Sequence, residues 1–124
     1  MARTSPSINR LHACKNPYQG KYKRVLCVCS AGLLRSPTTA LVLSQEPFNY
    51  NTRACGLHDY ALVEIDDVLV NWADEIVVME QYMLKGLPES ANGKPLICLD
   101  IKDQFEYRSA ELIELIKTRY LESQ

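Results

Sequence analysis

One stretch decides the fold of this chain: Lys23-Arg24-Val25-Leu26-Cys27-Val28-Cys29-Ser30-Ala31-Gly32-Leu33-Leu34-Arg35-Ser36-Pro37-Thr38. It begins as an apolar run, passes through small residues and continues as a helical pattern. A strand that ends in a short loop and leads into a helix builds an anion-binding site from backbone, because the loop N–H groups point inward and the helix N-terminus adds partial positive charge. The stretch therefore predicts a strand, an anion-binding loop and a helix, in that order.

Two reactive side chains bound the predicted loop. Cys29 opens it and Arg35 closes it, with five residues between them. A helix N-terminus and a nearby arginine can lower the pKa of a cysteine thiol from about 8.5 to roughly 3.5–7.5, so that the nucleophilic thiolate predominates. The Arg35 guanidinium can bind two phosphoryl oxygens at once, and the Ser36 hydroxyl can donate a hydrogen bond to the thiolate. The pattern favours nucleophilic attack on a phosphate monoester over a tight turn that merely buries a cysteine.

The composition is that of one soluble globular domain. The 124 residues are 47% hydrophobic and 23% charged. A formal net charge of −1 gives no basic field for nucleic acid or an anionic membrane, so neither partner is expected. No apolar run is long enough to span a bilayer, and the N-terminus lacks an apolar signal core. We therefore expect a cytoplasmic protein, and we expect it to be a monomer or a weak dimer.

The cysteines do not form a disulfide framework. An odd number of them, scattered through a chain without a signal core, argues against structural disulfides. No histidine cluster completes a zinc site beside the strand. The five are Cys14, Cys27, Cys29, Cys55 and Cys98.

The pattern of the whole chain predicts an α/β fold. Residues 1–22 read as an irregular leader, and residues 23–124 as one catalytic domain. Strands are expected at 25–28, 48–54, 75–79 and 96–101, and helices from 36 or 38 to 45, and at 61–72, 80–87 and 109–121. Strands that alternate with helices imply a parallel sheet covered on both faces, in which ligands bind beyond the carboxyl ends of the strands. Cys29 lies at such an end.

The same edge of the predicted sheet carries candidate acids. Hydrolysis through a cysteinyl phosphate needs an acid for the leaving group and then a base for water, and one carboxyl group can do both. Asp103 is best placed, because it follows the last predicted strand, and Asp100 is the second candidate. The structural alternative is that Asp103 begins the last loop and Asp100 caps the strand end.

At these residues the sequence resembles the low-molecular-weight protein tyrosine phosphatases. Cys29-Ser30-Ala31-Gly32-Leu33-Leu34-Arg35-Ser36-Pro37 resembles their C-x-G-N-x-C-R-S-P loop, and Asp103-Gln104-Phe105 resembles their D-P-[FY] motif. Ala54-Cys55-Gly56 is similar to their S-A-G step, and the segment 72–79 to their A-D-x-I-[LV]-V-M strand. The likeness covers residues 23 to 121 and looks closest to a small branch of predicted phosphatases.

The resemblance implies roles for the residues that match the motifs. Cys29 would be the nucleophile, Arg35 the phosphate clamp and Asp103 the general acid. The residues that would bind the substrate are Ser30, Ala31, Gly32, Leu33, Leu34, Ser36 and Phe105. The resemblance also implies a single three-layer, flavodoxin-like domain with a four-stranded parallel sheet in the order 2-1-3-4. It implies no metal or organic cofactor, and a phosphorylated protein, above all phosphotyrosine, or a small phosphate monoester as substrate.

The sequence departs from the family pattern at several positions, and three rival functions remain open. Gly32 stands where the family has Asn, Leu34 replaces its second loop cysteine, and Gln104 replaces its proline. The segment 28–32 also resembles the cysteine-type sugar phosphotransferase B subunits, which are phosphocarriers and do not need the closing arginine or the late aspartate. An arsenate reductase on the same scaffold would need two further cysteines close together, and residues 80–99 contain no such pair. A non-catalytic binding module would not need all three of the cysteine, the arginine and the aspartate.

Overall fold

A four-stranded parallel sheet forms the centre of the molecule. The computed structural model describes residues 23–30, 35–58, 61, 63–102 and 109–124, so the expected leader lies outside the described residues. The strands lie in the order β2-β1-β3-β4, which confirms the predicted topology. Their bounds are Arg24–Cys29 for β1, Asn51–Gly56 for β2, Glu75–Val78 for β3 and Leu96–Cys98 for β4.

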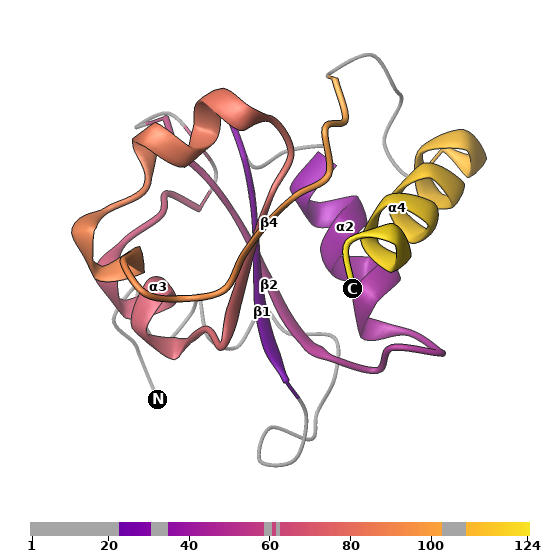
Figure 1. Ribbon diagram of the computed structural model, residues 1–124, viewed down its shortest axis with the longest axis horizontal. Coiled ribbons are helices and arrows are strands. Elements are labelled where there is room, and N and C mark those ends of the chain that lie inside the picture. The colour runs from indigo at the N-terminus through magenta and orange to yellow at the C-terminus, as the bar shows by residue number, and fades with distance from the viewer. Residues whose placement is uncertain (1–22, 31–34, 59–60, 62, 103–108) are drawn as a thin grey trace.

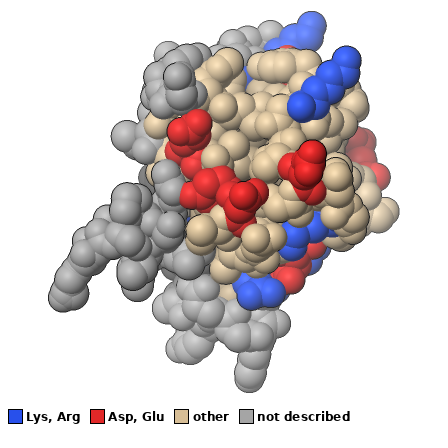
Figure 2. Space-filling model, turned by 90° about the vertical axis from the view of Figure 1, so that its left-hand side faces the viewer, with Lys and Arg blue, Asp and Glu red and all other residues tan. Residues whose placement is uncertain are grey.

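Helices cover both faces of this sheet, as the alternating pattern predicted (Figure 1). On one face lie α2 (Arg35–Ser44) and α4 (Ala110–Glu122). On the other lie α3 (Asp67–Trp72) and two 3-10 helices, η1 (Gln81–Gly86) and η2 (Glu89–Ala91). Acidic side chains gather at the centre of this second side of the molecule (Figure 2). Among the described residues, no helix is long and apolar enough to cross a membrane.

The strand and helix that the opening stretch predicts both form. Residues 25–29 of β1 are all buried, as expected for a central strand with neighbours on both sides. The helix α2 begins at Arg35, one residue before the earliest predicted start, and Pro37 lies in its first turn, where a missing N–H costs little. Both α2 and β1 contribute to a single apolar core. The cysteine and the arginine of the motif therefore stand on two rigid elements.

The second strand is displaced from its predicted position. It was expected at 48–54 but begins at Asn51, because the chain still turns over the preceding residues. The amides of Phe48 and Asn49 both donate to the carbonyl of Gln45 at 3.0 Å, and Asn49 has a φ of 55°. Phe48 and Tyr50 instead pack against Tyr120 of α4 (Ala110–Glu122).

The predicted helix at 61–72 forms only in its second half, as α3. Asp66 caps the helix by accepting a backbone N–H at 2.9 Å. Before it, the amide of Gly56 donates to Val63, and the amide of Ile65 donates to Gly56, each at 2.9 Å. This segment therefore extends along the end of β2, where hydrogen bonds to Gly56 take the place of a helical turn.

Two later elements also differ from prediction. The helix expected at 80–87 is the 3-10 helix η1, and η2 follows it. The strand expected at 96–101 ends at Cys98, because Asp100 adopts a φ of 55°, which a strand cannot contain. The turn at Asp100 shapes the sheet edge that carries the candidate site.

The last helix follows its prediction closely. Ser109 is its N-cap and accepts the amide of Leu112 at 3.2 Å. Leu112, Ile116 and Tyr120 are fully buried along one stripe, and the neighbouring Leu115 is partly buried. This stripe closes the core on the side of α2.

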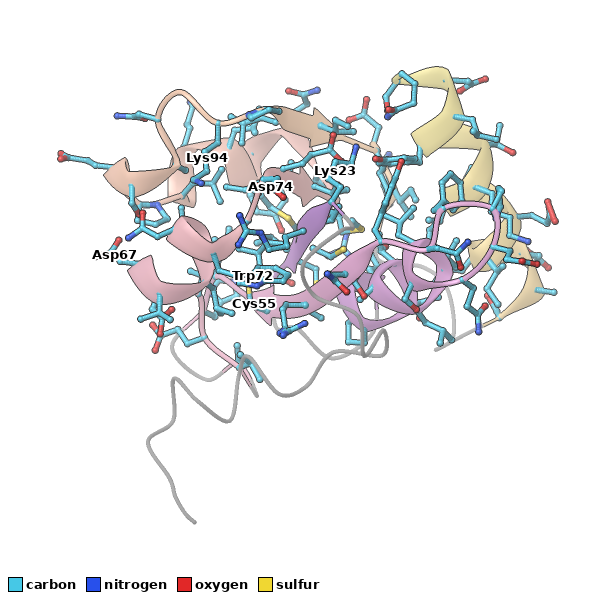
Figure 3. The ribbon with its side chains drawn as sticks, turned by 90° about the horizontal axis from the view of Figure 1, so that it is seen from below. Lys23, Cys55, Asp67, Trp72, Asp74 and Lys94 are labelled. Carbon is cyan, nitrogen blue, oxygen red and sulfur yellow. The ribbon has the colours of Figure 1, made fainter. Side chains whose placement is uncertain are left out.

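Tyr120 fixes the end of α4 to the amino-terminal edge of the sheet. Its hydroxyl donates to the Glu75 carboxylate at 2.8 Å and accepts from Lys23 Nζ at 3.0 Å. Lys23 also pairs with Glu75 at 3.2 Å and lies 4.5 Å from the ring centroid of Tyr50. Phe48 packs edge-on to the Tyr120 ring, at 5.3 Å between centroids. Lys23 and Asp74 lie near one another when the molecule is viewed from this end (Figure 3).

Burial, and then the hydrogen bond to Glu75, raise the pKa of the Tyr120 hydroxyl. A tyrosine in the unfolded chain loses its proton near pH 10, whereas the folded chain keeps it there. The stability that this hydroxyl contributes is therefore fully present below about pH 10 and is lost as the pH rises above it.

We predict that Tyr120→Phe lowers the free energy of unfolding by about 1–3 kcal/mol at pH 7, because it leaves a buried carboxylate with one donor fewer. Urea denaturation measures the change. Leu121→Ala is the matched control: Leu121 is 57% exposed, so its loss should cost less than about 0.5 kcal/mol. The difference between wild type and Tyr120→Phe should shrink above pH 10. Equal stability of wild type and Tyr120→Phe at pH 7 would contradict the role given to this hydroxyl.

Candidate active site

The ends of the central strands place the site. The amide of Met79 donates to Val28 at 3.2 Å, and the amide of Ile101 donates to Met79 at 2.8 Å. The end of β1 and the residues that follow β3 and β4 therefore lie side by side at the carboxyl edge of the sheet. Cys29 ends β1 at this edge and is 3% exposed. Its carbonyl accepts the Leu57 amide at 3.0 Å, which holds the start of the loop against the chain beyond β2.

A chain of hydrogen bonds begins at the Cys29 sulfur. The thiol donates to Ser36 Oγ at 3.1 Å, and Ser36 Oγ donates to the carbonyl of Cys55 at 3.1 Å. When the thiol loses its proton, the sulfur can only accept, so the Ser36 hydroxyl must turn from the carbonyl to the sulfur. A hydrogen bond to a charged group is stronger than one between neutral groups. Ser36 is therefore placed to stabilise the thiolate.

Cys27 has the same side chain but not the same surroundings. It lies two residues before Cys29 on β1 and is fully buried in the core. Burial raises the pKa of the Cys27 thiol well above its usual value, with smaller effects in the same direction from neighbouring groups. Its thiol stays protonated and inert at neutral pH. Within β1, only the last residue reaches the carboxyl edge of the sheet.

Arg35 is buried beside this sulfur chain, at the first position of α2. It is 2% exposed. Its Nη1 lies 2.6 Å from Glu80 Oε2 and donates to the carbonyl of Ile101 at 2.8 Å. These two acceptors follow β3 and β4, so the guanidinium joins α2 to the edge of the sheet. A buried guanidinium held in this way is oriented before any ligand arrives.

The structure brings together part of the predicted site. Cys29, Arg35 and Ser36 meet at the carboxyl edge, and Ser30 follows Cys29 at the start of the loop. All the other residues predicted for the site lie outside the part of the chain that the structure describes: Ala31, Gly32, Leu33, Leu34, Asp103 and Phe105.

The second candidate acid has a defined place. Asp100 is exposed at the same edge of the sheet. Within the described ranges, its carboxylate accepts only the Cys98 thiol, at 3.4 Å. It contacts neither Arg35 nor the sulfur chain, so its position does not favour it over Asp103.

Sequence reasoning missed Glu80. The pattern predicted that Glu80 begins a helix, whereas the structure pairs it with the Arg35 guanidinium. The signal was present, because Glu80 is the first acidic residue after an apolar strand that ends at the same edge as Cys29. In the part of the chain that the structure describes, His, Cys, Asp and Glu form no group of three that could hold a metal ion.

The fold is that of the low-molecular-weight protein tyrosine phosphatases, as the resemblance predicted. The tyrosine phosphatase Wzb from Escherichia coli K30, solved with phosphate, matches with a TM-score of 0.65 at 16% identity, over 82% of this chain and 95% of that one. Wzb from Vibrio vulnificus, solved with benzylphosphonate, matches with a TM-score of 0.64 at 20% identity, over 82% and 96%.

The scaffold also carries other chemistry. A thioredoxin-dependent arsenate reductase from Corynebacterium glutamicum matches with a TM-score of 0.60 at 18% identity, over 94% of this chain and 67% of that one. Neither a protein-family model nor a curated protein matches the sequence. At these identities the similarity establishes a shared fold.

We predict that Ser36→Ala slows alkylation of Cys29 by iodoacetamide at pH 6 by roughly 5- to 30-fold, because the thiolate loses a charge-assisted hydrogen bond. Mass spectrometry of the alkylated peptide gives the rate. Thr39→Val is the control, since it removes a hydroxyl that bonds to Arg35 O at 2.8 Å in the same helix and leaves the sulfur chain intact. Equal rates in Ser36→Ala and wild type would show that the hydroxyl does not act on the sulfur.

We also predict that Glu80→Gln lowers the stability of the ligand-free protein by about 1–3 kcal/mol, because a buried guanidinium loses its counter-charge. Inorganic phosphate should then raise the melting temperature of the variant more than that of wild type, since the ligand replaces the missing charge. Thermal unfolding with and without phosphate measures both effects. Glu114→Gln, at an exposed position of α4, controls for the loss of one negative charge. A phosphate response no greater than that of wild type would refute this role of Glu80.

Proposed function

We propose that this protein is a cysteine-dependent phosphatase that hydrolyses phosphate monoesters through a cysteinyl-phosphate intermediate. The observation that carries the proposal is the Cys29 sulfur at the carboxyl edge of the sheet, 3.1 Å from Ser36 Oγ, with the buried Arg35 one position before that serine in α2. This arrangement offers a nucleophile, a group to stabilise its charged form and a cation for the phosphoryl oxygens. The shared fold with solved tyrosine phosphatases supports the same function.

The proposed reaction has two steps. In the first, the Cys29 thiolate attacks phosphorus, an S–P bond forms, and the bond from phosphorus to the ester oxygen breaks as Asp103 gives that oxygen a proton. In the second, Asp103 takes a proton from water, the water oxygen attacks phosphorus, and the S–P bond breaks. Inorganic phosphate leaves, and the thiolate is restored.

Arg35 and the loop act on the charge of the transferring group. The positive guanidinium balances negative charge that spreads over the equatorial oxygens in the transition state. The backbone N–H groups of residues 30–34 are proposed to hold the same oxygens. Because Arg35 is already fixed by Glu80 and Ile101, little reorganisation accompanies the reaction.

The finer proposal is that the substrate is protein phosphotyrosine. It rests on the resemblance of Asp103-Gln104-Phe105 to the phosphatase motif, in which Phe105 would form a wall beside the tyrosine ring. The protein is proposed to act in the cytoplasm, as a monomer or a weak dimer, without a metal or organic cofactor.

Arsenate reduction is the second candidate function, because one solved neighbour is an arsenate reductase. That chemistry needs cysteines that pass a disulfide along. Cys27 and Cys55 are buried in the core, which makes them poor partners for an external reductant. Phosphatase chemistry needs a single cysteine, Cys29, so it is the simpler interpretation of this site.

We predict that wild-type protein hydrolyses p-nitrophenyl phosphate with an acidic pH optimum, since attack pairs a thiolate with a substrate monoanion whose second pKa is about 6. Cys29→Ser should abolish turnover, and Asp103→Asn should lower kcat by about 10²- to 10⁴-fold, the usual effect of a general acid. Cys98→Ser, which removes a partly exposed thiol outside the sulfur chain, should retain full activity.

Other outcomes would identify the rival functions. Stable phosphorylation of Cys29 without turnover would replace hydrolysis with a phosphocarrier role. Arsenate-dependent oxidation of a thiol reductant would favour the reductase. An inactive Asp100→Asn beside an active Asp103→Asn would move the general acid to Asp100.

A further inference from the structure

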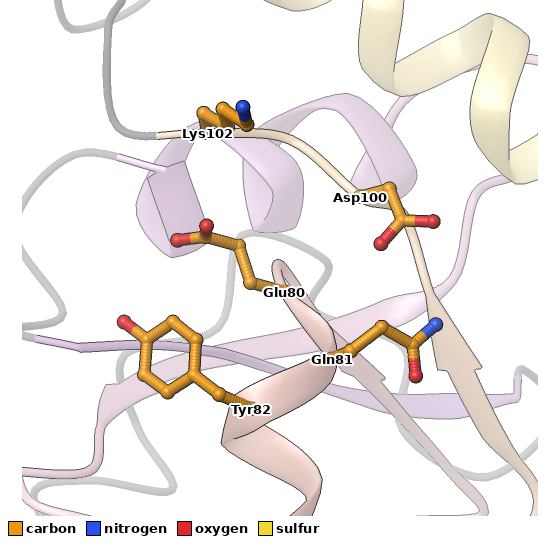
Figure 4. A pocket seen from close by; sticks show the side chains of 5 residues that line it. All are labelled: Glu80, Gln81, Tyr82, Asp100 and Lys102. Atoms are coloured by element: carbon orange, nitrogen blue, oxygen red, sulfur yellow. The ribbon is translucent and has the colours of Figure 1, made fainter.

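A pocket opens beside Glu80, the ion-pair partner of Arg35, between the residues that follow β3 and those that follow β4. Its volume is about 360 Å³. The side chains that line it are Glu80, Gln81, Tyr82, Asp100 and Lys102 (Figure 4). For scale, an engineered apolar cavity of about 150 Å³ admits a benzene molecule. A phenyl ring with its attached atoms therefore fits within this pocket.

The pocket shares a wall with the phosphate clamp. Glu80 lines the pocket and also contacts Arg35 Nη1 at 2.6 Å. Ile101, whose carbonyl accepts from the same nitrogen at 2.8 Å, lies between the lining residues Asp100 and Lys102 in the sequence. An ester group on a phosphate held by Arg35 thus has this pocket as its neighbour on the β3–β4 side.

Tyr82 is the apolar wall of the pocket. Its side chain is 56% exposed, the second-largest exposed fraction among the large hydrophobic residues that the structure describes. Its hydroxyl makes no hydrogen bond to the described residues. Figure 4 shows its ring on the same side of the pocket as the Glu80 carboxylate, which points between the ring and Lys102. An exposed ring of this kind offers a face to another planar group.

The ring stands on a rigid support. The next residue, Met83, is fully buried, and its amide donates to the Glu80 carbonyl at 3.0 Å. Glu80, which contacts Arg35, and Tyr82, which carries the ring, thus belong to one short turn at the start of η1. The ring keeps a fixed relation to the phosphate clamp, as a specificity residue requires.

The charges of the lining cancel. Glu80 is balanced by Arg35, and neither Asp100 nor Lys102 makes an ion pair among the described residues. The positive charge of Lys102 offsets that of Asp100 across the pocket. The lining therefore asks for no counter-charge from a ligand, and a neutral aromatic ring can enter without leaving a buried charge unmatched.

We propose that this pocket binds the aromatic ring of an aryl phosphate ester, and that Tyr82 is the residue that selects an aryl group over an aliphatic one. The inference rests on the proposed phosphatase function and deepens it. It assigns ring recognition to the start of η1, in addition to the wall expected from Phe105.

The test compares two ligands that share one anionic head. Titration calorimetry gives the dissociation constants of inorganic phosphate and of benzylphosphonate for wild type, Tyr82→Ala and Tyr82→Phe. Tyr82→Ala should weaken benzylphosphonate by about 3- to 10-fold, the size of one aromatic pair, and leave phosphate within about twofold. Tyr82→Phe should bind both ligands as wild type does. Leu121→Ala, an exposed apolar position on α4, is the control for loss of a surface side chain.

Two results would overturn the inference: an unchanged affinity of Tyr82→Ala for benzylphosphonate, or an equal loss of affinity for both ligands. The first would show that the ring of the ligand does not contact Tyr82 in the pocket. The second would show that Tyr82 contributes to binding of the anion itself. Because calorimetry does not depend on turnover, a failure to hydrolyse p-nitrophenyl phosphate would count against the proposed function alone.

Discussion

The buried guanidinium of Arg35 is the constraint on which the carboxyl edge depends. A charge that is withdrawn from water costs several kcal/mol unless it is paired and hydrogen-bonded. Glu80 and the Ile101 carbonyl meet this need, and they come from the ends of two different strands. The start of α2 and the ends of β3 and β4 must therefore keep one arrangement. A phosphate dianion adds negative charge beside the same cation, so the arrangement that folding requires is also one that binding can use.

Charged side chains are paired at the amino-terminal edge of the sheet, whereas some at the carboxyl edge make no ion pair among the described residues. At the amino-terminal edge, the Tyr120 hydroxyl accepts a hydrogen bond from Lys23 and donates one to Glu75. Lys23 also lies over the ring of Tyr50, so the charged groups of this cluster are partnered within the protein. At the carboxyl edge, Arg35 pairs with Glu80, which lines a pocket in which Asp100 and Lys102 have no ion pair among the described residues. A parallel sheet favours this division, because its strands all end, and its loops diverge, at the same edge. One edge can be used for stability while the other stays open to a ligand.

The local sequence pattern predicted correctly those elements whose conformation depends on their own residues and near neighbours. The run that ends at Cys29 is apolar because β1 is buried on both faces, and Ser109 caps α4 through a contact three residues away. Prediction failed where a distant contact decides the conformation. The turn before β2 places Phe48 on Tyr120, far away in the sequence, and the Arg35–Glu80 pair spans 45 residues. Periodicity in a short window carries no information about such partners.

Cys27 and Cys29 show why position decides chemistry more than residue type does. Both occupy β1, two residues apart, yet burial keeps the pKa of the Cys27 thiol high while Cys29 meets a hydroxyl at the edge of the sheet. The hydroxyl of Ser36 cannot serve the Cys29 thiolate and the Cys55 carbonyl at once. In the proposed reaction, ionisation of the sulfur would therefore draw this hydroxyl away from the Cys55 carbonyl of β2. Formation of the S–P bond would remove the charge from the sulfur and let the hydroxyl return to that carbonyl.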